Sequence, residues 1–253
     1  LHQNEPSHLS SIEPRPYVLP KMYAGVLEKL RNFSVREDDI WITTFPKSGT
    51  TWMQEMCWLI LNNYDFETAK QTDLEIRSPF FEYNTMIPIE YINTLELLEQ
   101  IKAPRLIKSH LPIGFLPTEL WKKNTKIIHV FRDPRDAILS YYYMLLGKGL
   151  NLGTLEEFLE LFINDSVSSF WNYTLDFWKL RHNPKYFFIT YEELKEDLES
   201  VIKKTCAFLN KPITEDQMTK MLEHLSFKNM KSKTVFENTI KFIYLYSFII
   251  IFF

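Results

Sequence analysis

This chain of 253 residues is poor in glycine, cysteine and net charge, and each shortage excludes a class of protein. A formal net charge of −3 argues against broad nucleic-acid binding, so a basic site for an anionic ligand would have to be local. The two cysteines, Cys57 and Cys206, lie far apart in apolar helical patterns and outside any metal-ligand spacing. We therefore expect buried free thiols, a reducing cytoplasmic location and no metal site.

The sequence also lacks an apolar run long enough to cross a membrane. The first twenty residues are polar and rich in proline, unlike a signal peptide. Residues 240–253 are intensely apolar but fall short of the ~20 residues that a membrane helix needs. We expect this tail to be the truncated or misread end of a longer chain, and we expect no membrane association. A tail that anchors the protein in a membrane is the alternative.

The length suits one substantial α/β domain over residues 1–253, and no internal repeat or linker divides it. Short apolar runs predict buried strands at residues 39–43, 105–108, 126–131 and 185–190. Helical spacing covers residues 50–62, 133–146, 155–163, 166–181, 191–209 and 214–224. Strands that alternate with helices predict a central parallel sheet flanked by helices on both faces.

The most informative segment is the run TTFPKSGTTW at residues 43–52, between a predicted strand and a predicted helix. Backbone N–H groups converge at a helix N-terminus, and the helix dipole adds partial positive charge there. Lys47 supplies a full charge, Gly49 frees the backbone, and further donors come from the hydroxyls of Ser48, Thr50 and Thr51. The pattern predicts a site for phosphate or a group of similar shape.

An ordinary strand-to-helix turn, capped by Thr50 or Thr51, is the structural alternative. The loop does not fit the pattern G-x-x-x-x-G-K-[ST] of nucleotide triphosphatases, because Lys47 precedes Gly49 and no earlier glycine stands in place. ATP with magnesium is therefore disfavoured. A phosphoryl-transfer enzyme that uses ATP stays open as a rival.

The sequence of residues 43–52 closely resembles that of the donor-binding loop of the cytosolic sulfotransferases, with Phe45 where tyrosine is usual. In that family the loop grips the 5′-phosphosulfate of 3′-phosphoadenosine 5′-phosphosulfate (PAPS). The resemblance implies that PAPS is the co-substrate, held by a P-loop-like phosphosulfate-binding loop. It implies that Lys47 helps the departing phosphate and that Trp52 stacks on adenine. The implied donor contacts in the loop are Lys47, Ser48, Gly49, Thr50, Thr51 and Trp52.

A second segment, KSHLP at residues 108–112, follows a predicted strand at the same sheet edge as the loop. A lone histidine is more often a structural hydrogen-bonding group. A histidine near neutral pKa nevertheless suits proton removal from a hydroxyl, and a lysine suits the charge on a moving sulfuryl group. The segment resembles the family's second signature, with Ser109 in place of the frequent threonine. The resemblance implies that His110 is the catalytic base and that Lys108 contacts the transferring group.

A third segment resembles the family's site for the 3′-phosphate of the donor. Arg132 ends a predicted strand and Ser140 follows eight residues later. The planar guanidinium of arginine binds phosphate bidentately. The alternatives are a surface salt bridge of Arg132 with Asp133 or Asp136, and a solvated helix position for Ser140.

Softer resemblances extend to the adenine and to the acceptor. Tyr191, Ser226 and Phe227 match residues around the family's adenine site. Residues 79–83 resemble a segment that lines the acceptor cavity, which implies acceptor contacts for Phe80, Phe81 and Tyr143 beside Lys108 and His110. An aromatic pocket suits phenols and other flat hydroxylated molecules. An ordinary aromatic core is the alternative for each of these residues.

The likeness runs over residues 12–238 and stops at the C-terminal end. The family's closing segment over the 3′-phosphate and its short dimerisation motif do not appear, although the family implies a homodimer. The sequence predicts transfer of a sulfuryl group from PAPS to a hydroxyl of a small aromatic or hydrophobic acceptor. No metal is called for, since lysines and loop amides neutralise the charge. A member that binds PAPS but is catalytically impaired is the alternative.

Overall fold

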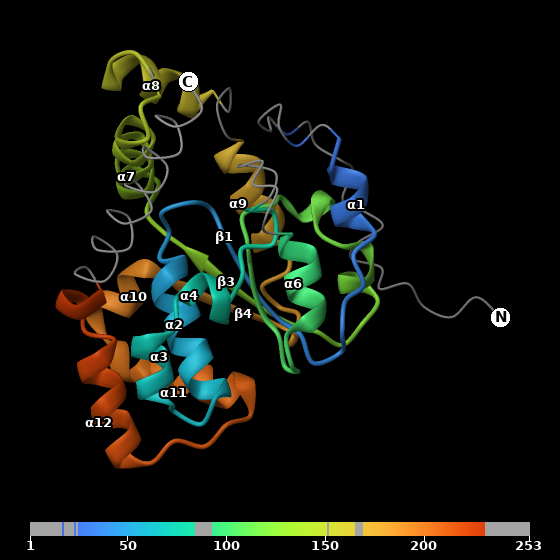
Figure 1. The fold of residues 1–253 in the computed structure, drawn as a ribbon. Coiled ribbons are helices and arrows are strands. Elements are labelled where there is room, and N and C mark those ends of the chain that lie inside the picture. Colours follow the sequence, from blue (N-terminus) through green and yellow to red (C-terminus); the bar gives the residue numbers. More distant parts are fainter. Residues whose placement is uncertain are drawn as a thin grey trace, which may run out of the picture.

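The computed structural model describes Tyr17, Tyr23 and residues 25–83, 93–150, 152–164 and 169–230. Its centre is a parallel sheet in the strand order β2-β1-β3-β4 (Figure 1). The strands are β1 (Ile40–Thr44), β2 (Leu106–Ser109), β3 (Lys126–Phe131) and β4 (Tyr186–Thr190). The predicted parallel sheet is confirmed, and its strands begin and end within one residue of the predicted limits.

The strands are apolar along their whole length because helices cover both faces of the sheet. All five residues of β1 are buried. Side chains alternate between faces, so Ile40 and Ile42 enter one core while Trp41 enters the other. The first core includes residues of α2 (Thr50–Leu61), α11 (Leu198–Leu209) and α12 (Glu215–His224). The second includes residues of α1 (Leu27–Arg31), α6 (Thr94–Gln100), α7 (Pro134–Gly147), α8 (Leu155–Ile163) and α9 (Phe170–Trp178). Figure 1 shows the two groups on opposite sides of the sheet.

The six predicted helical segments all contain helices, in the predicted order, but two of them differ in extent, and four further helices at residues 27–31, 66–71, 74–77 and 94–100 were not predicted. The predicted helix at residues 191–209 is two helices, because Asp197 ends the first and accepts a hydrogen bond from Ser200 N at the start of the second. The predicted helix at residues 166–181 covers only nine residues and begins after Ser169, which has a left-handed φ of 47°. The helices are α1 (Leu27–Arg31), α2 (Thr50–Leu61), α3 (Phe66–Gln71), α4 (Leu74–Arg77), α6 (Thr94–Gln100), α7 (Pro134–Gly147), α8 (Leu155–Ile163), α9 (Phe170–Trp178), α10 (Tyr191–Glu196), α11 (Leu198–Leu209) and α12 (Glu215–His224), with 3-10 turns η2 (Ile113–Phe115) and η3 (Thr118–Trp121).

The carboxyl ends of the strands meet at one edge of the sheet. Thr43 pairs with Ser109 on β2 and with His129 on β3. The segments that leave this edge are the loop at residues 45–49, the turn that begins at His110 and the start of α7 after Arg132. The topology therefore brings the three predicted signatures to the same edge.

Within the described ranges, no helix combines the length and the apolar character needed to cross a bilayer. The predicted apolar tail at residues 240–253 lies outside the described residues.

A buried ion pair ties β1 to β2 at the opposite edge of the sheet. Arg105 Nε lies 2.6 Å from Asp39 Oδ1, and Arg105 Nη2 lies 2.5 Å from Asp39 Oδ2. The guanidinium also donates to the carbonyls of Leu98 and Ser34. Because both side chains are sealed from solvent, removing one charge leaves the other buried and uncompensated.

We expect Asp39→Asn to lower the free energy of unfolding by about 3 kcal/mol, since it leaves the Arg105 charge without its counter-ion. Urea denaturation measures this loss. Asp38→Asn, at an exposed neighbouring carboxylate, is the matched control and should change stability by less than about 0.5 kcal/mol. Equal effects of the two substitutions would contradict a structural role for the pair.

Candidate functional site

The loop between β1 and α2 is folded by two left-handed residues. Lys47 has a φ of 69° and Gly49, the N-cap of α2, has a φ of 101°. No side chain caps the helix, and the Thr50 hydroxyl instead lies 2.5 Å from the Thr44 hydroxyl. The predicted alternative, a turn capped by Thr50 or Thr51, is therefore wrong. The first N–H groups of α2 are left to bind an anion, together with the helix dipole.

Only glycine fits at residue 49. A Cβ atom there would lie 2.9 Å from Cδ2 of Tyr191, and the left-handed φ is itself strained for any other residue. The Tyr191 ring thus packs directly on the loop. This contact joins the predicted phosphate loop to the predicted adenine site.

His110 follows β2 and turns back toward β1. Its Nδ1 lies 2.8 Å from the Thr44 carbonyl oxygen and 3.2 Å from the Thr44 hydroxyl. Because a carbonyl oxygen only accepts hydrogen bonds, Nδ1 carries the proton and Nε2 holds the lone pair. The imidazole is therefore fixed in the tautomer that can take a proton at Nε2.

His110 carries no charge at pH 7, but its pKa lies well below the near-neutral value best suited to a general base. Burial, and then the Lys108 charge, lower the pKa of His110 to about 3, although the hydrogen bond to Thr44 acts in the opposite direction. The imidazole is neutral at pH 7. A negatively charged donor would offset the Lys108 charge and raise this pKa, which strengthens the base when the donor is bound.

Positive charge gathers around this imidazole. Burial lowers the pKa of Lys47, and the charges of Arg132, Lys148 and Lys108 lower it further. Lys108 Nζ lies 4.6 Å from the centre of the Phe80 ring and 3.6 Å from Glu75 Oε1. The chain has a net charge of −3, so this concentration of cations marks an anion site.

Arg132 is aimed at the same loop. Its Nη1 donates to the Lys47 carbonyl oxygen at 2.7 Å, and its guanidinium lies 4.2 Å from the centre of the Tyr191 ring. Asp133 instead pairs with Arg135 at 2.5 Å and caps α7. Within the described ranges the buried Nε of Arg132 has no hydrogen-bond partner. An orphaned buried donor beside an anion loop fits a phosphate oxygen.

The predicted adenine residues form one aromatic cluster. The Trp52 ring centre lies 6.0 Å from those of Tyr191 and Phe227, with Tyr191 edge-on. The Phe227 side chain is 47% exposed, whereas Trp52 is buried at the N-terminus of α2. Ser226 accepts a hydrogen bond from Asn229 N at 3.4 Å, so its hydroxyl also caps the turn that holds Phe227. Ser140 is half-buried on α7, two turns beyond Arg132.

The predicted acceptor residues lie in different parts of the structure. The Phe80 ring centre lies 5.1 Å from that of His110. Phe81 is 1% exposed and packs edge-on against Phe33 and Trp41 in the core. Tyr143 is 60% exposed on α7. The structure brings Phe80 to the base and does not bring Phe81 or Tyr143 there.

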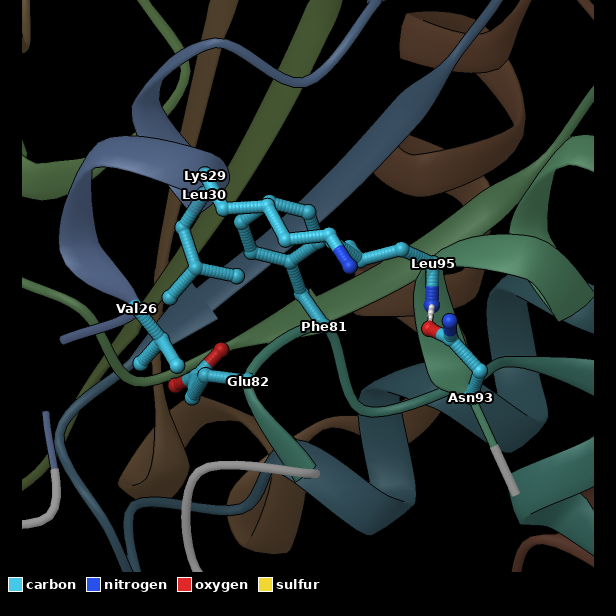
Figure 2. A pocket seen from close by; sticks show the side chains of 7 residues that line it. All are labelled: Val26, Lys29, Leu30, Phe81, Glu82, Asn93 and Leu95. Carbon is cyan, nitrogen blue, oxygen red and sulfur yellow. Dashed lines mark hydrogen bonds between the residues drawn. The ribbon is translucent and has the colours of Figure 1, made fainter. Parts of the chain in front are cut away.

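A small cavity of about 80 Å³ lies beside the acceptor segment (Figure 2). It contains none of the predicted donor or catalytic side chains. Its walls are mainly apolar, and Glu82 and Asn93 add polar groups on them (Figure 2). The lining residues are Val26, Lys29, Leu30, Phe81, Glu82, Asn93 and Leu95.

Three residues at this edge were not predicted as site residues. Thr44 lies within the recognised loop motif, but only its contacts with His110 and Thr50 reveal a role. Lys148 lies at the C-cap of α7, and its charge lowers the pKa of Lys47 and of His110. Glu82 accepts a hydrogen bond from the main chain of His110 at 2.5 Å. No pattern along the sequence marks these contacts, because each joins residues far apart in the chain.

In the part of the chain that the structure describes, no group of three or more His, Cys, Asp and Glu side chains could hold a metal ion.

The family model described as "Sulfotransferase domain" matches residues 37–243. The chain is 38% identical over 228 residues to luciferin sulfotransferase of Photinus pyralis, covering 83% of this chain and 61% of that protein. It is 39% identical over 208 residues to sulfotransferase 1 family member D1 of Rattus norvegicus, covering 81% of this chain and 70% of that protein. This chain thus spans less than two thirds of the length of the luciferin sulfotransferase.

Solved structures resemble this fold as well. Retinol dehydratase in complex with androsterone and the inactive cofactor PAP, the donor without its sulfuryl group, superposes with a TM-score of 0.76 at 26% identity. That match covers 86% of this chain and 72% of the other. A mouse sulfotransferase complexed with PAP gives a TM-score of 0.68 at 30% identity, with 83% and 72% covered.

We expect Gly49→Ala to lower the free energy of unfolding by about 1–3 kcal/mol and to weaken PAP binding, because Cβ displaces Tyr191 and the left-handed φ is strained. Urea denaturation and calorimetric PAP titration measure the two effects. Gly114→Ala is the matched control, since a Cβ atom there meets nothing within 4 Å. PAP affinity that is unchanged in Gly49→Ala would separate this loop from the donor site.

Proposed function

We propose, from the premise that this chain belongs to the sulfotransferase domain family, that it transfers a sulfuryl group from PAPS to a hydroxyl group of a small apolar acceptor. The observation that carries the proposal is the hydrogen bond from His110 Nδ1 to the Thr44 carbonyl. It leaves a neutral Nε2 lone pair at the sheet edge where Lys47 and Lys108 gather. A proton acceptor beside an anion site is what transfer to a hydroxyl requires.

In the proposed reaction, Nε2 of His110 takes the proton of the acceptor hydroxyl. The acceptor oxygen then forms a bond to sulfur as the bond from sulfur to the 5′-phosphate oxygen breaks. Lys47 and the N–H groups of the loop stabilise the negative charge on the departing phosphate, and Lys108 stabilises the sulfuryl oxygens. The imidazolium afterwards releases its proton to solvent. PAP and a sulfate ester are the products.

The other predicted site residues are assigned to the remaining parts of the donor. Arg132 and Ser140 hold the 3′-phosphate, and the unpaired Nε of Arg132 supports this role. Trp52, Tyr191 and Phe227 surround the adenine, with Ser226 beside them. Ser48, Gly49, Thr50 and Thr51 bind the 5′-phosphosulfate through loop N–H groups and hydroxyls. PAP in the solved structures of two relatives supports the same donor here.

The acceptor class follows from Phe80 and from the relatives. The ring of Phe80 against His110 gives the base an apolar neighbour, which suits a hydroxyl on a flat or apolar molecule. Relatives are named for luciferin or solved with androsterone or retinol. Phe81 packs in the core and Tyr143 is exposed on α7, so neither is assigned a contact with the acceptor. A cytoplasmic location stays a prediction of the resemblance to the cytosolic family, in which a homodimer is possible.

The impaired alternative gains no support from the comparisons. The matched segment, residues 37–243, includes all three signatures, and each carries the residues that the chemistry requires. The segments outside the described residues do not bear on this assignment.

We expect His110→Ala to lower kcat for sulfate transfer by roughly 10²- to 10⁴-fold, because the acceptor hydroxyl loses its base. Transfer of labelled sulfate from PAPS to a panel containing phenol, androsterone and retinol measures this loss. PAP affinity should stay within about twofold, since Nε2 acts on the acceptor. His182→Ala, at an exposed histidine, is the matched control and should leave transfer unchanged.

The rival functions predict other outcomes in the same assay. PAP binding without any sulfated product from the wild-type protein would favour a binding protein. Magnesium-dependent binding and turnover of ATP would favour phosphoryl transfer.

We expect Arg132→Ala to weaken PAP binding roughly 10- to 100-fold, since a charge-assisted hydrogen bond contributes about 1.5–3 kcal/mol. Calorimetric titration measures the affinity. Arg135→Ala is the matched control, because that neighbouring side chain is 88% exposed and pairs with Asp133. Adenosine 5′-phosphate, which lacks the 3′-phosphate, should bind wild type and Arg132→Ala alike. An equal loss for both nucleotides would refute the assignment of the 3′-phosphate.

A further inference from the structure

The outer edge of β2 is covered by a short segment at residues 79–82, in which Phe80 forms a bridge to β2 and residues 81 and 82 form a turn. Lys108 N donates to the Pro79 carbonyl at 3.0 Å, and Phe81 N donates to the Lys108 carbonyl at 2.8 Å. Phe80 and Lys108 thus form an isolated parallel bridge. If this parallel pairing continued, the next N–H group to donate from this edge would be that of His110.

The main chain of the segment does not reach that N–H group. Tyr83 N donates to the Phe80 carbonyl at 3.0 Å, so the segment turns away from β2 directly after the bridge. The side chain of Glu82 replaces the missing carbonyl: His110 N donates to its Oε1 at 2.5 Å. The Glu82 residue is 0% exposed. Glu82 therefore anchors the first turn after β2.

Two side chains of this segment contact His110. Phe80 lies against the imidazole with its ring plane at 63° to it, and Glu82 holds the main chain of the same residue. Phe81, between them, points into the core against Trp41. One short segment thus contacts His110 at the ring and at the backbone.

We propose that Glu82 is a positioning residue for sulfuryl transfer, which holds the His110 imidazole at the Thr44 carbonyl by fixing the His110 main chain. Glu82 acts through His110 and touches neither the donor nor the transferring group. The inference rests on the proposed function, since it takes His110 as the base. It assigns a catalytic consequence to a residue whose side chain is fully buried.

The protonation state of Glu82 does not matter to this role. Burial raises the pKa of Glu82 to about 7, although the hydrogen bonds from His110 and Ser109 and the Lys108 charge oppose the shift. A carboxylate and a protonated carboxyl group both offer an oxygen to the His110 N–H. An amide offers the same oxygen, so glutamine can replace glutamate at this position. Aspartate keeps the charge but is one methylene shorter.

We expect Glu82→Ala and Glu82→Asp to lower kcat roughly 30- to 100-fold, because a base displaced by about 1 Å transfers protons poorly. Glu82→Gln should stay within about threefold of wild type, since the amide oxygen restores the hydrogen bond. The rate is expressed per PAP-binding site, counted by calorimetric titration. PAPS is the donor, and the acceptor is the member of the phenol, androsterone and retinol panel that wild type uses fastest.

The count of PAP-binding sites separates positioning from loss of folded protein. A merely structural role would lower the number of binding sites and leave kcat per site unchanged. Asp39→Asn provides that comparison, because it removes a buried carboxylate at the far edge of the same two strands. It should lose stability and keep kcat per site. If Glu82→Ala fails to fold, the pair Glu82→Asp and Glu82→Gln decides the question.

Nuclear magnetic resonance tests the same contact without turnover. Glu82→Ala should speed hydrogen exchange at the His110 amide and weaken the Nδ1–H signal of its imidazole, and Glu82→Gln should preserve both. Unchanged kcat per site in Glu82→Ala, with wild type active, would overturn the inference and leave the proposed function intact. No transfer by wild type would overturn the proposed function, and the imidazole signals would then show whether the contact itself is wrong.

Discussion

The hydrogen bond between His110 and the Thr44 carbonyl is the interaction on which the site depends. It joins the residues that follow two neighbouring parallel strands, and the pairing of Thr43 with Ser109 sets their alignment. A carbonyl acceptor fixes the tautomer, so the sheet itself decides which ring nitrogen can act as a base. His129, on the neighbouring strand β3, shows the contrast, because it is buried in the core and its ring stacks on Phe177. Position at the sheet edge distinguishes the two histidines.

The site also concentrates positive charge that only folding can bring together. Burial lowers the pKa of Lys47, and the charges of Arg132, Lys148 and Lys108 lower it further. An incoming donor carries negative charge on both phosphate groups and relieves this repulsion. The electrostatic preference for an anionic donor is therefore built into the fold, without rearrangement of charged side chains at the moment of reaction. The stability that tolerates this repulsion comes from elsewhere, including the two apolar cores and the buried pair of Arg105 with Asp39.

The sequence predicts best what depends on neighbours along the chain. Apolar runs locate the four strands. The segments at residues 43–52 and 108–112 mark the loop and the base, because each is a short continuous motif at the carboxyl end of a strand. The break at Asp197 is missed because helical spacing continues through a residue that also caps the next helix. Thr44, Glu82 and Lys148 escape detection because their roles arise from contacts between distant residues. Phe80 and Phe81 are adjacent and alike, and only the direction of the backbone assigns one to the site and the other to the core.

The donor and acceptor sides of the site are therefore constrained differently. On the donor side of the proposed site, the contacts come largely from main-chain groups of one loop and one helix N-terminus. The left-handed conformations of that loop admit few residue types, so the motif can be recognised in the sequence. On the acceptor side, the base is held by a bridge of a few residues on the outer edge of β2. That segment can vary at Phe80 and beyond while Glu82 keeps His110 in place. In the proposed function, the side chain beside the acceptor and the side chain that anchors the base are different residues of one short segment, so the acceptor contact can change without moving the base.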